Sequence, residues 1–297
     1  MYKLIASDLD GTLSDSSRIL DFRVKEKIED LYKNGWIILF NTGRFYKYAE
    51  ELLSSLTCPY FLAVQNGACL LDPSKSIIDE YSLSKDWLSV LVKETRKFNI
   101  TWWIESGFSY NDIIFLDNFD FYSTENKEIF LSVINNYFPN EREKKVYIKE
   151  LKNSLLEYPY DFFSVAKTIG PLSVIRNIAD KLNEMFHNAC SITSISVPRH
   201  LNFGMIHITH KQASKEKVLS RLVNNISSEK DVFTIVAGDD QNDYKMIKNG
   251  DFKIVMNTAP EFMLRLADYI APSAKEQGII KALEEGEKMY LKQLSRY

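Results

Sequence analysis

The chain has 297 residues, and its 40 acidic side chains nearly balance 37 lysines and arginines, for a formal net charge of −3. This length exceeds that of a typical single domain, about 100–200 residues, so we expect two domains or one domain with a large insertion. The balanced charge argues against a nucleic-acid-binding protein and against a polybasic membrane-binding module, because both need an excess of cations.

Targeting segments and cysteine patterns narrow the class of protein further. No apolar run approaches the roughly 18–20 residues that cross a bilayer, and the first residues lack the apolar stretch of a signal peptide. The three cysteines, Cys58, Cys69 and Cys190, are widely spaced and fit no zinc-binding pattern. We therefore expect a cytoplasmic protein, a monomer or small homo-oligomer, with neither a membrane nor a nucleic-acid partner.

The first third of the chain alternates short apolar runs with helical patterns. The apolar runs are Leu4–Ala6, Trp36–Phe40 and Tyr60–Val64. Runs without polar alternation are typical of strands covered on both faces in a parallel sheet. Apolar residues at helical spacing predict helices over Phe22–Lys33 and Tyr46–Leu56. The alternation therefore predicts right-handed βαβ units.

The last third of the chain repeats this organisation. Apolar runs at Val232–Ala237, Lys253–Met256 and Tyr269–Ala271 predict three more strands. Short helices are predicted between them, at about Asp243–Asn249 and Pro260–Ala267. Both ends of the chain thus carry the pattern of one α/β sheet.

The middle of the chain has mixed patterns. We predict helices over Lys85–Phe98, Lys127–Tyr137 and Leu172–Phe186, and strands over Thr101–Ser106, Ile192–Val197 and Gly204–Thr209. The predicted fold class is therefore α/β: a Rossmann-like parallel-sheet core formed by residues 1–82 and 211–297, with an α+β domain, residues 83–210, inserted between them. Insertion at a loop is a common way for such chains to grow.

Polar residues follow the predicted core strands at the points where these strands end. Asp8 and Asp10 follow the first run, Thr42-Gly43-Arg44 follows the second, and the segment Gly238–Asp243 follows the strand after the insertion. Ligands of open α/β sheets bind outside the carboxyl ends of the strands, so we expect these side chains at one rim. Crowded carboxylates repel each other unless a cation joins them, and an all-oxygen set favours Mg²⁺ over zinc.

The hexapeptide Asp8-Leu9-Asp10-Gly11-Thr12-Leu13 is more specific than a simple turn. An EF-hand loop also begins with two alternate acids, but it needs glycine and glutamate where this chain has Leu13 and Ile19. The hexapeptide resembles the first motif of the haloacid dehalogenase-like superfamily. Thr42-Gly43-Arg44 resembles its second motif, Lys215 its third, and Gly238–Asp243 its fourth. An insertion between the second and third motifs resembles the Cof-type sugar-phosphatase branch, in which an α/β cap selects the substrate.

The resemblance implies a phosphoryl-aspartate mechanism. Asp8 would be the nucleophile and Asp10 the general acid and base. The implied Mg²⁺ ligands are Asp8, the backbone carbonyl of Asp10, Asp239 and Asp243. The implied phosphate-binding residues are Thr42, Gly43, Lys215, Asn242 and Arg44.

Several of these residues have plainer interpretations. Thr42 could cap the next helix, and Lys215 could be a solvated lysine, because Lys211 and Lys217 lie close by and Glu216 replaces the glycine usual in relatives. Asn242 could be a turn residue, whereas the resemblance favours a role in orienting Lys215 or a loop. Outside the motifs, Arg199 and His200 could reach the substrate, whereas His207 and His210 lack a third ligand at a useful spacing and are not expected to bind a metal.

Three functions remain open at this point. The first is a Mg²⁺-dependent phosphatase, a phosphoric monoester hydrolase acting on small phosphorylated metabolites, above all sugar phosphates. The second is a sugar phosphomutase that uses the same residues. The third is a non-catalytic binding protein with a relic site, although the complete acidic set argues against decay. A true haloacid dehalogenase is disfavoured, because that branch lacks an acid equivalent to Asp10.

Overall fold

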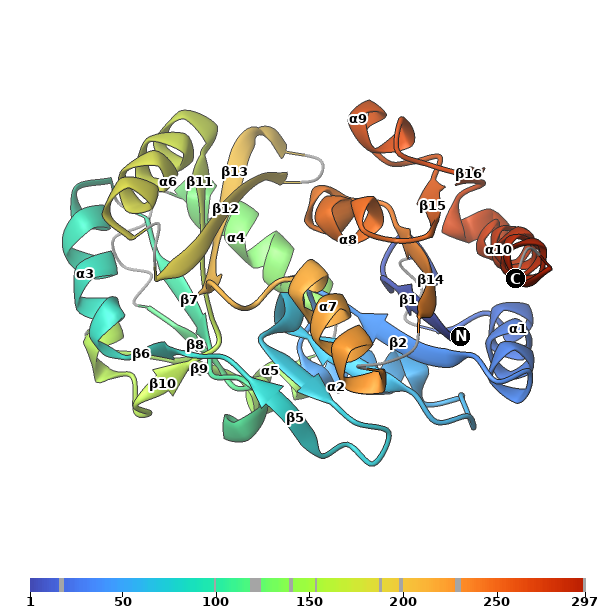
Figure 1. Ribbon diagram of the computed structural model, residues 1–297. Helices are drawn as coiled ribbons and strands as arrows, with labels where there is room; N and C mark the ends of the chain where they lie inside the picture. The colour runs from blue at the N-terminus through green and yellow to red at the C-terminus, as the bar shows by residue number, and fades with distance from the viewer. Residues whose placement is uncertain are drawn as a thin grey trace. The chain divides into compact units, whose positions relative to one another are not determined.

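The computed structural model describes the chain in two compact units (Figure 1). The described residues are 1–15, 19–98, 100–117, 124–138, 141–152, 154–186, 189–197, 200–227 and 231–295. The first unit comprises Met1–Glu80 and Ala213–Tyr297, and the second comprises Tyr81–Gln212. The second unit therefore contains the whole of the predicted insertion, residues 83–210, with a short extension at each end.

The first unit is built on an eight-stranded sheet in the order β16-β15-β14-β1-β2-β3-β4-β5. Its strands are β1 (Tyr2–Ser7), β2 (Ile37–Asn41), β3 (Phe61–Val64), β4 (Cys69–Leu71), β5 (Ile77–Glu80), β14 (Val232–Gly238), β15 (Phe252–Met256) and β16 (Tyr269–Ala271). The strands from β16 to β3 are parallel, whereas β4 and β5 add an antiparallel edge that the sequence analysis did not predict.

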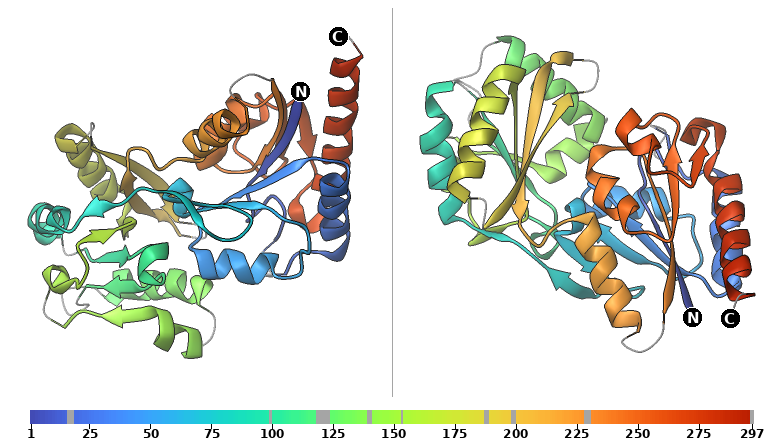
Figure 2. Two further views of the ribbon diagram at one scale, coloured as in Figure 1. Left: turned by 60° about the horizontal axis from the view of Figure 1, so that its bottom comes forward. Right: turned by 45° about the horizontal axis from the view of Figure 1, so that its top comes forward.

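Helices cover both faces of this sheet, as the views in Figures 1 and 2 show. They are α1 (Phe22–Lys33), α2 (Tyr46–Leu53), α7 (Lys215–Ile226), α8 (Tyr244–Lys248), α9 (Glu261–Leu264) and α10 (Ile279–Leu294). The chain moves from β1 to β3 in one direction and from β14 to β16 in the other. Because parallel crossovers are right-handed, α1 and α2 lie on one face and α8 and α9 on the other. This arrangement confirms the predicted α/β class.

Apolar side chains fill the space between the sheet and its helices. Leu4 of β1 packs in one cluster with Val218 of α7. Trp36, just before β2, packs edge-on against Tyr290 of α10, with 5.4 Å between ring centroids. Helix α10 was not predicted from the sequence. Its apolar side chains complete the buried core of the first unit. The polar residues of this unit that matter for function lie outside this core, at the ends of the strands.

The second unit contains a six-stranded sheet in the order β12-β13-β11-β7-β8-β9 and a separate two-stranded sheet, β10-β6. The strands are β6 (Leu83–Ser84), β7 (Trp102–Glu105), β8 (Ile114–Leu116), β9 (Ile148–Glu150), β10 (Phe162–Phe163), β11 (Val165–Pro171), β12 (Cys190–Val197) and β13 (His200–His210). The helices are α3 (Asp86–Thr95), α4 (Thr124–Tyr137), α5 (Glu141–Tyr147) and α6 (Leu172–Phe186). Pairing is antiparallel except between β8 and β9, which fits the predicted α+β character.

Neighbouring residues of β7 point to opposite faces of the six-stranded sheet, as the strand period requires. Trp102 belongs to the apolar cluster formed with α3 and α6. Trp103 packs on the other side against Phe130 of α4, with 5.2 Å between ring centroids. On that side the buried carboxylate of Glu105 pairs with the buried ammonium of Lys167. The sequence contained no local sign of this ion pair, because its members lie on different strands.

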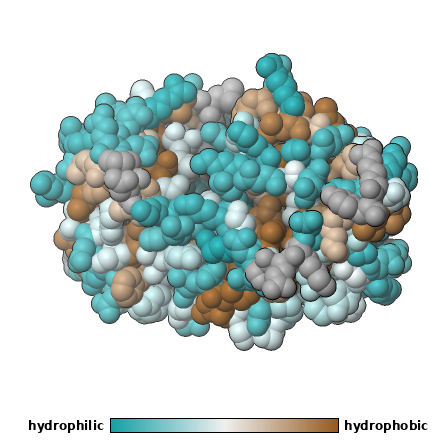
Figure 3. Space-filling view, in the orientation of Figure 1, coloured by the Kyte–Doolittle hydropathy of each residue, from teal (hydrophilic) through white to brown (hydrophobic). Residues whose placement is uncertain are grey.

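Among the described helices, none is long and apolar enough to cross a membrane. Figure 3 shows that apolar side chains on the visible face are interspersed with hydrophilic ones. Isolated exposed apolar residues of this kind are normal for a folded protein and need no partner to explain them.

Candidate active site

Three carboxylates converge at the carboxyl ends of β1 and β14. These strands are parallel neighbours with Ser7 opposite Ala237, and the backbone N–H of Asp8 donates to the Ala237 carbonyl at 3.0 Å. Asp8 and Asp239, the residues after the paired ends, are thereby brought together. One carboxylate oxygen each from Asp8, Asp239 and Asp243 lie within 4.8 Å of one another.

Two glycines allow the carboxylates to approach the backbone this closely. Gly11 has a φ of +80°, and a Cβ atom there would lie 2.3 Å from Oδ2 of Asp239. A Cβ atom at Gly238 would lie 2.6 Å from Cγ of Asp243. Real Cβ atoms do not come so close to other atoms, so a larger residue at either position would displace a carboxylate. The Thr12 hydroxyl donates to Oδ1 of Asp239 at 2.9 Å and holds this carboxylate in place.

Lys215 places a buried ammonium between two of these carboxylates. Its Nζ lies 2.6 Å from Oδ1 of Asp8 and 2.6 Å from Oδ1 of Asp243, and its side chain is only 1% exposed. The alternative of a solvated lysine is therefore wrong. Lys215 is the first residue of α7, and its backbone carbonyl accepts a hydrogen bond from the Asn41 amide at the end of β2, at 2.9 Å.

The electrostatics of the cluster favour an additional positive charge. Burial raises the pKa of Asp8 well above its ordinary value; Lys215 lowers it, and Asp243 and Asp239 raise it further. Burial and the neighbouring Asp243 raise the pKa of Asp239 to about 7. Burial alone would lower the pKa of Lys215, but Asp243 and Asp8 outweigh this effect and raise it. One ammonium does not balance three close carboxylates, and an all-oxygen set of this kind fits a hard divalent cation.

Asp10 lies beside the cluster and is held by two side chains. The Arg44 guanidinium donates to it through Nε at 2.9 Å and Nη2 at 3.2 Å, and the Tyr48 hydroxyl donates to Oδ1 at 3.0 Å. Arg44, predicted to contact the substrate phosphate, thus contacts the general-acid candidate in this structure. A planar guanidinium matches both oxygens of a carboxylate, which explains this pairing. Tyr48 was not predicted from the sequence, although it lies only four residues after Arg44, in the first turn of α2.

Thr42 lies at the end of β2 and is fully buried. Its hydroxyl accepts the Arg44 N–H at 3.1 Å. The N-cap of α2 is Phe45, so the alternative that Thr42 caps this helix is wrong. Thr42 is instead part of the turn that leads Arg44 toward Asp10.

The remaining predicted phosphate-binding residues meet at Asn66. A Cβ atom at Gly43 would lie 3.2 Å from the Asn66 side-chain oxygen, and this oxygen accepts the Asn242 amide at 2.9 Å. Of its two anticipated roles, Asn242 thus takes the loop-holding one here, and Asn66 joins the loops after β2 and β14. Asn66 was not predicted to belong to the site, because its partners are far away in the sequence.

Two pairs of candidate residues lie outside the motifs, Arg199 with His200 and His207 with His210. Arg199 lies outside the described residues, and His200 begins β13. His207 Nε2 lies 2.9 Å from the sulfur of Met205, and His210 stacks on Tyr81 with 5.5 Å between ring centroids. Among the described residues, the side chains that lie close enough together to bind a metal ion are those of Asp8, Asp239 and Asp243.

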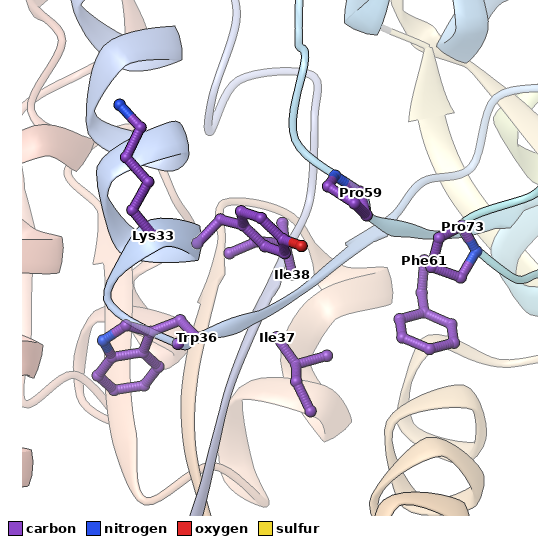
Figure 4. Close-up of a pocket in the computed structure, with 9 residues that line it drawn as sticks. Lys33, Trp36, Ile37, Ile38, Pro59, Phe61 and Pro73 are labelled. Carbon is purple, nitrogen blue, oxygen red and sulfur yellow. The ribbon is translucent and has the colours of Figure 1, made fainter.

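A pocket of about 530 Å³ lies elsewhere in the first unit (Figure 4). Its walls include Trp36, Ile37 and Phe61, and the last two begin β2 and β3. The acids follow the carboxyl ends of the strands, so this pocket is at the opposite end of the sheet. Because it is lined by no carboxylate, it is not the candidate active site.

Comparisons with known proteins agree with this geometry. A family model described as haloacid dehalogenase-like hydrolase matches residues 5–283. A Bacillus subtilis protein, 5-amino-6-(5-phospho-D-ribitylamino)uracil phosphatase YcsE, is 24% identical over 281 residues, which is 95% of this chain and 94% of that protein.

Two solved structures share the fold along nearly the whole chain. BT1666 from Bacteroides thetaiotaomicron, described among phosphatases of the haloalkanoate enzyme superfamily, has a TM-score of 0.74 and 16% identity, and the match covers 97% of this chain and 96% of that one. BT4131, described as a subclass IIB sugar phosphatase, has a TM-score of 0.68 and 18% identity, with 95% and 98% covered. These two matches show the shared fold, and the family model and the relative's name agree with the expected phosphoric monoester hydrolase.

Proposed function

The chain belongs to the haloacid dehalogenase-like hydrolase family, and we propose that it is a Mg²⁺-dependent phosphatase of small phosphorylated metabolites, above all sugar phosphates. The observation that carries this proposal is the buried ammonium of Lys215, 2.6 Å from both Asp8 and Asp243. A lysine and three carboxylates at the carboxyl ends of parallel strands suit phosphoryl transfer, which depends mainly on positioning and charge.

Asp8 is the proposed nucleophile. Its carboxylate oxygen forms a bond to phosphorus while the bond from phosphorus to the ester oxygen breaks, which leaves an aspartyl phosphate. Lys215 donates to Oδ1 of Asp8 and so directs this carboxylate. In the second step, water attacks phosphorus, the bond to Asp8 breaks and phosphate is released.

Asp10 is the proposed general acid and base. It gives a proton to the departing ester oxygen in the first step and takes a proton from the attacking water in the second. One carboxyl group can serve both steps, because loss of its proton in the first step leaves the carboxylate that accepts a proton in the second step. Its contacts to Arg44 and Tyr48 support a fixed carboxylate at this place.

Thr42, Gly43 and Lys215 are proposed to bind the phosphate oxygens, with Asn242 and Arg44 at the edge of this group. Backbone N–H groups, hydroxyls and an ammonium are the donors that phosphate oxygens need. Burial of Thr42 and Lys215 strengthens such contacts, because the local dielectric is low.

Asp8, Asp239 and Asp243 would hold the Mg²⁺ ion, together with the backbone carbonyl of Asp10. When bound, the ion supplies positive charge that offsets repulsion between the carboxylates and the phosphate. The support for this assignment is the mutual approach of three carboxylate oxygens within 4.8 Å and the raised pKa of Asp8 and Asp239.

The substrate class is inferred from relatives. One relative is named for a phosphorylated ribityl compound and one structural neighbour is described as a sugar phosphatase. We assign substrate selection to the inserted domain, residues 83–210, because small phosphorylated metabolites differ in the part beyond the phosphate. The protein is assigned to the cytoplasm, where such metabolites are found.

A phosphate-release assay tests the proposal. The purified chain is incubated with Mg²⁺ and a panel of sugar phosphates, and free phosphate and sugar products are measured together. We expect release of phosphate that stops on chelation of Mg²⁺ and disappears in Asp8→Asn, while Asp30→Asn, an exposed change on α1, retains it. Isomerised sugar phosphate without phosphate release would instead indicate a phosphomutase, and full activity of Asp8→Asn would refute the nucleophile assignment.

A further inference from the structure

The Tyr48 side chain contacts the Asp10 carboxylate from helix α2. Its hydroxyl donates to Oδ1 of Asp10 at 3.0 Å, and its ring lies 4.5 Å from the guanidinium carbon of Arg44. Tyr48 is 5% exposed, so the direction of its hydroxyl is set by packing. Its ring also packs edge-on against Phe45, with 6.5 Å between centroids.

We propose that Tyr48 is a positioning residue that, through its phenolic hydroxyl, holds Asp10 in place for proton transfer to the leaving group. The inference rests on the proposed phosphatase function. Arg44 and Tyr48 both donate to Oδ1 of Asp10, whereas among the described residues Oδ2 accepts from the Arg44 Nε. The rotation of the carboxyl group is thereby restricted, and Oδ2 is the oxygen with more remaining capacity to carry a proton.

The hydroxyl and the ring of Tyr48 have separable roles. The contacts with Phe45 and Arg44 use the ring, which phenylalanine would keep. The contact with Asp10 uses the hydroxyl, which phenylalanine would lose. Tyr48→Phe therefore removes one hydrogen bond to the carboxyl group and leaves the packing of α2 intact.

A positioned acid matters only when the leaving group needs a proton. An alkyl phosphate leaves as a basic alkoxide and depends on protonation, whereas dinitrophenyl phosphate releases a weakly basic phenolate that does not. The ratio kcat/KM covers the steps up to departure of this group, so it isolates the acid step from the later attack of water. A defect in Asp10 positioning therefore depends on the leaving group.

The experiment compares Tyr48→Phe with wild type on a sugar phosphate and on dinitrophenyl phosphate, both with Mg²⁺. We expect kcat/KM to fall about tenfold for the sugar phosphate and less than about twofold for the dinitrophenyl ester. Tyr46→Phe is the matched control. Tyr46 lies on the same helix, and its phenolic hydroxyl donates to Glu50 rather than to Asp10. We expect it to match wild type on both substrates.

An equal loss on both substrates would overturn the inference, because it would indicate a general structural defect. No loss on either substrate would overturn it as well. A wild-type chain that hydrolyses neither ester would refute the proposed function, and the inference with it. The two failures are thus distinguished by the activity of the wild-type chain.

Discussion

The Lys215 ammonium lies 2.6 Å from Oδ1 of Asp8, although the two residues are 207 positions apart in the chain. Asp8 follows the first strand and Lys215 begins a helix after the insertion. The same ammonium contacts Asp243, so it joins two carboxylates that would otherwise repel each other in a buried place. Removal of this single charge should affect both stability and activity.

Lys215→Met should therefore lower the free energy of unfolding by about 3 kcal/mol, because it leaves two carboxylates buried without their cation. Activity should fall by about a hundredfold or more, since a phosphate-binding group is also lost. Denaturant titration and a phosphate-release assay measure the two effects. Lys217→Met, two positions along the same helix, is the control and should retain activity. If Lys217→Met were the inactive variant, the assignment of Lys215 would be wrong.

Gly11→Ala should reduce both stability and activity. The residue has a φ of +80°, and an added Cβ would lie 2.3 Å from the Asp239 carboxylate. We expect a loss of about 1–3 kcal/mol in unfolding free energy, with activity reduced at least tenfold. The matched control is Gly35→Ala, where φ is +83° but the nearest atom would be the Lys3 Cε at 3.6 Å. It should lose stability while keeping activity; equal activities in the two variants would contradict the role of Gly11.

Mg²⁺ should raise the melting temperature of the wild-type chain, because an ion that binds only the folded state stabilises it. At a Mg²⁺ concentration about 100 times the Kd, the stabilisation would be about 2.7 kcal/mol. Asp239→Asn should abolish this shift, since it removes a charged ligand from the cluster. Asp240→Asn, a change at the adjacent exposed residue, should keep it. Differential scanning fluorimetry with and without chelator measures both, and an unchanged shift in Asp239→Asn would exclude this carboxylate as a ligand.

His207 should make the stability of the second unit depend on pH. Burial and the nearby Lys167 lower the pKa of His207 well below its ordinary value, so the folded state keeps the ring neutral. The unfolded chain binds a proton below about pH 6.5, and stability is therefore lost as the pH falls. Between pH 7 and pH 5.5 the loss should be at most about 1.3 kcal/mol.

Tryptophan fluorescence in a Trp36→Phe background measures this effect. The chain has four tryptophans, and the remaining three, Trp87, Trp102 and Trp103, all lie in the second unit. Denaturant titrations at the two pH values should show a smaller difference when His207→Gln is added. A pH dependence that is the same in both backgrounds would contradict the neutral buried ring.

The local pattern of the chain determined much of the core. Apolar runs that stop at polar residues predicted where the strands end, and so predicted that Asp8, Asp10 and Asp239 follow strand ends. Helix α6 likewise has the predicted bounds, Leu172–Phe186. Such features depend on neighbours in sequence, because strand and helix periods are short. The parallel pairing of β1 with β14 then brings the acids together. These relationships could be predicted because parallel strands end at a common rim.

Contacts between distant segments decided the rest. The motif resemblance singled out Lys215, but its neighbours in sequence also fitted a solvated lysine, and only the packing of α7 beside β2 makes it buried. The Tyr48 hydroxyl donates to Asp10, and Lys167 pairs with Glu105; in both pairs the partners come from different structural elements. A sequence contains the side chains and their local spacing, but the partner of a charge depends on which segments become neighbours when the apolar cores form. The acids of the site and Lys215 were therefore identifiable in the sequence, whereas the carboxylates that Lys215 contacts and the Tyr48 hydroxyl on Asp10 were determined by the tertiary structure.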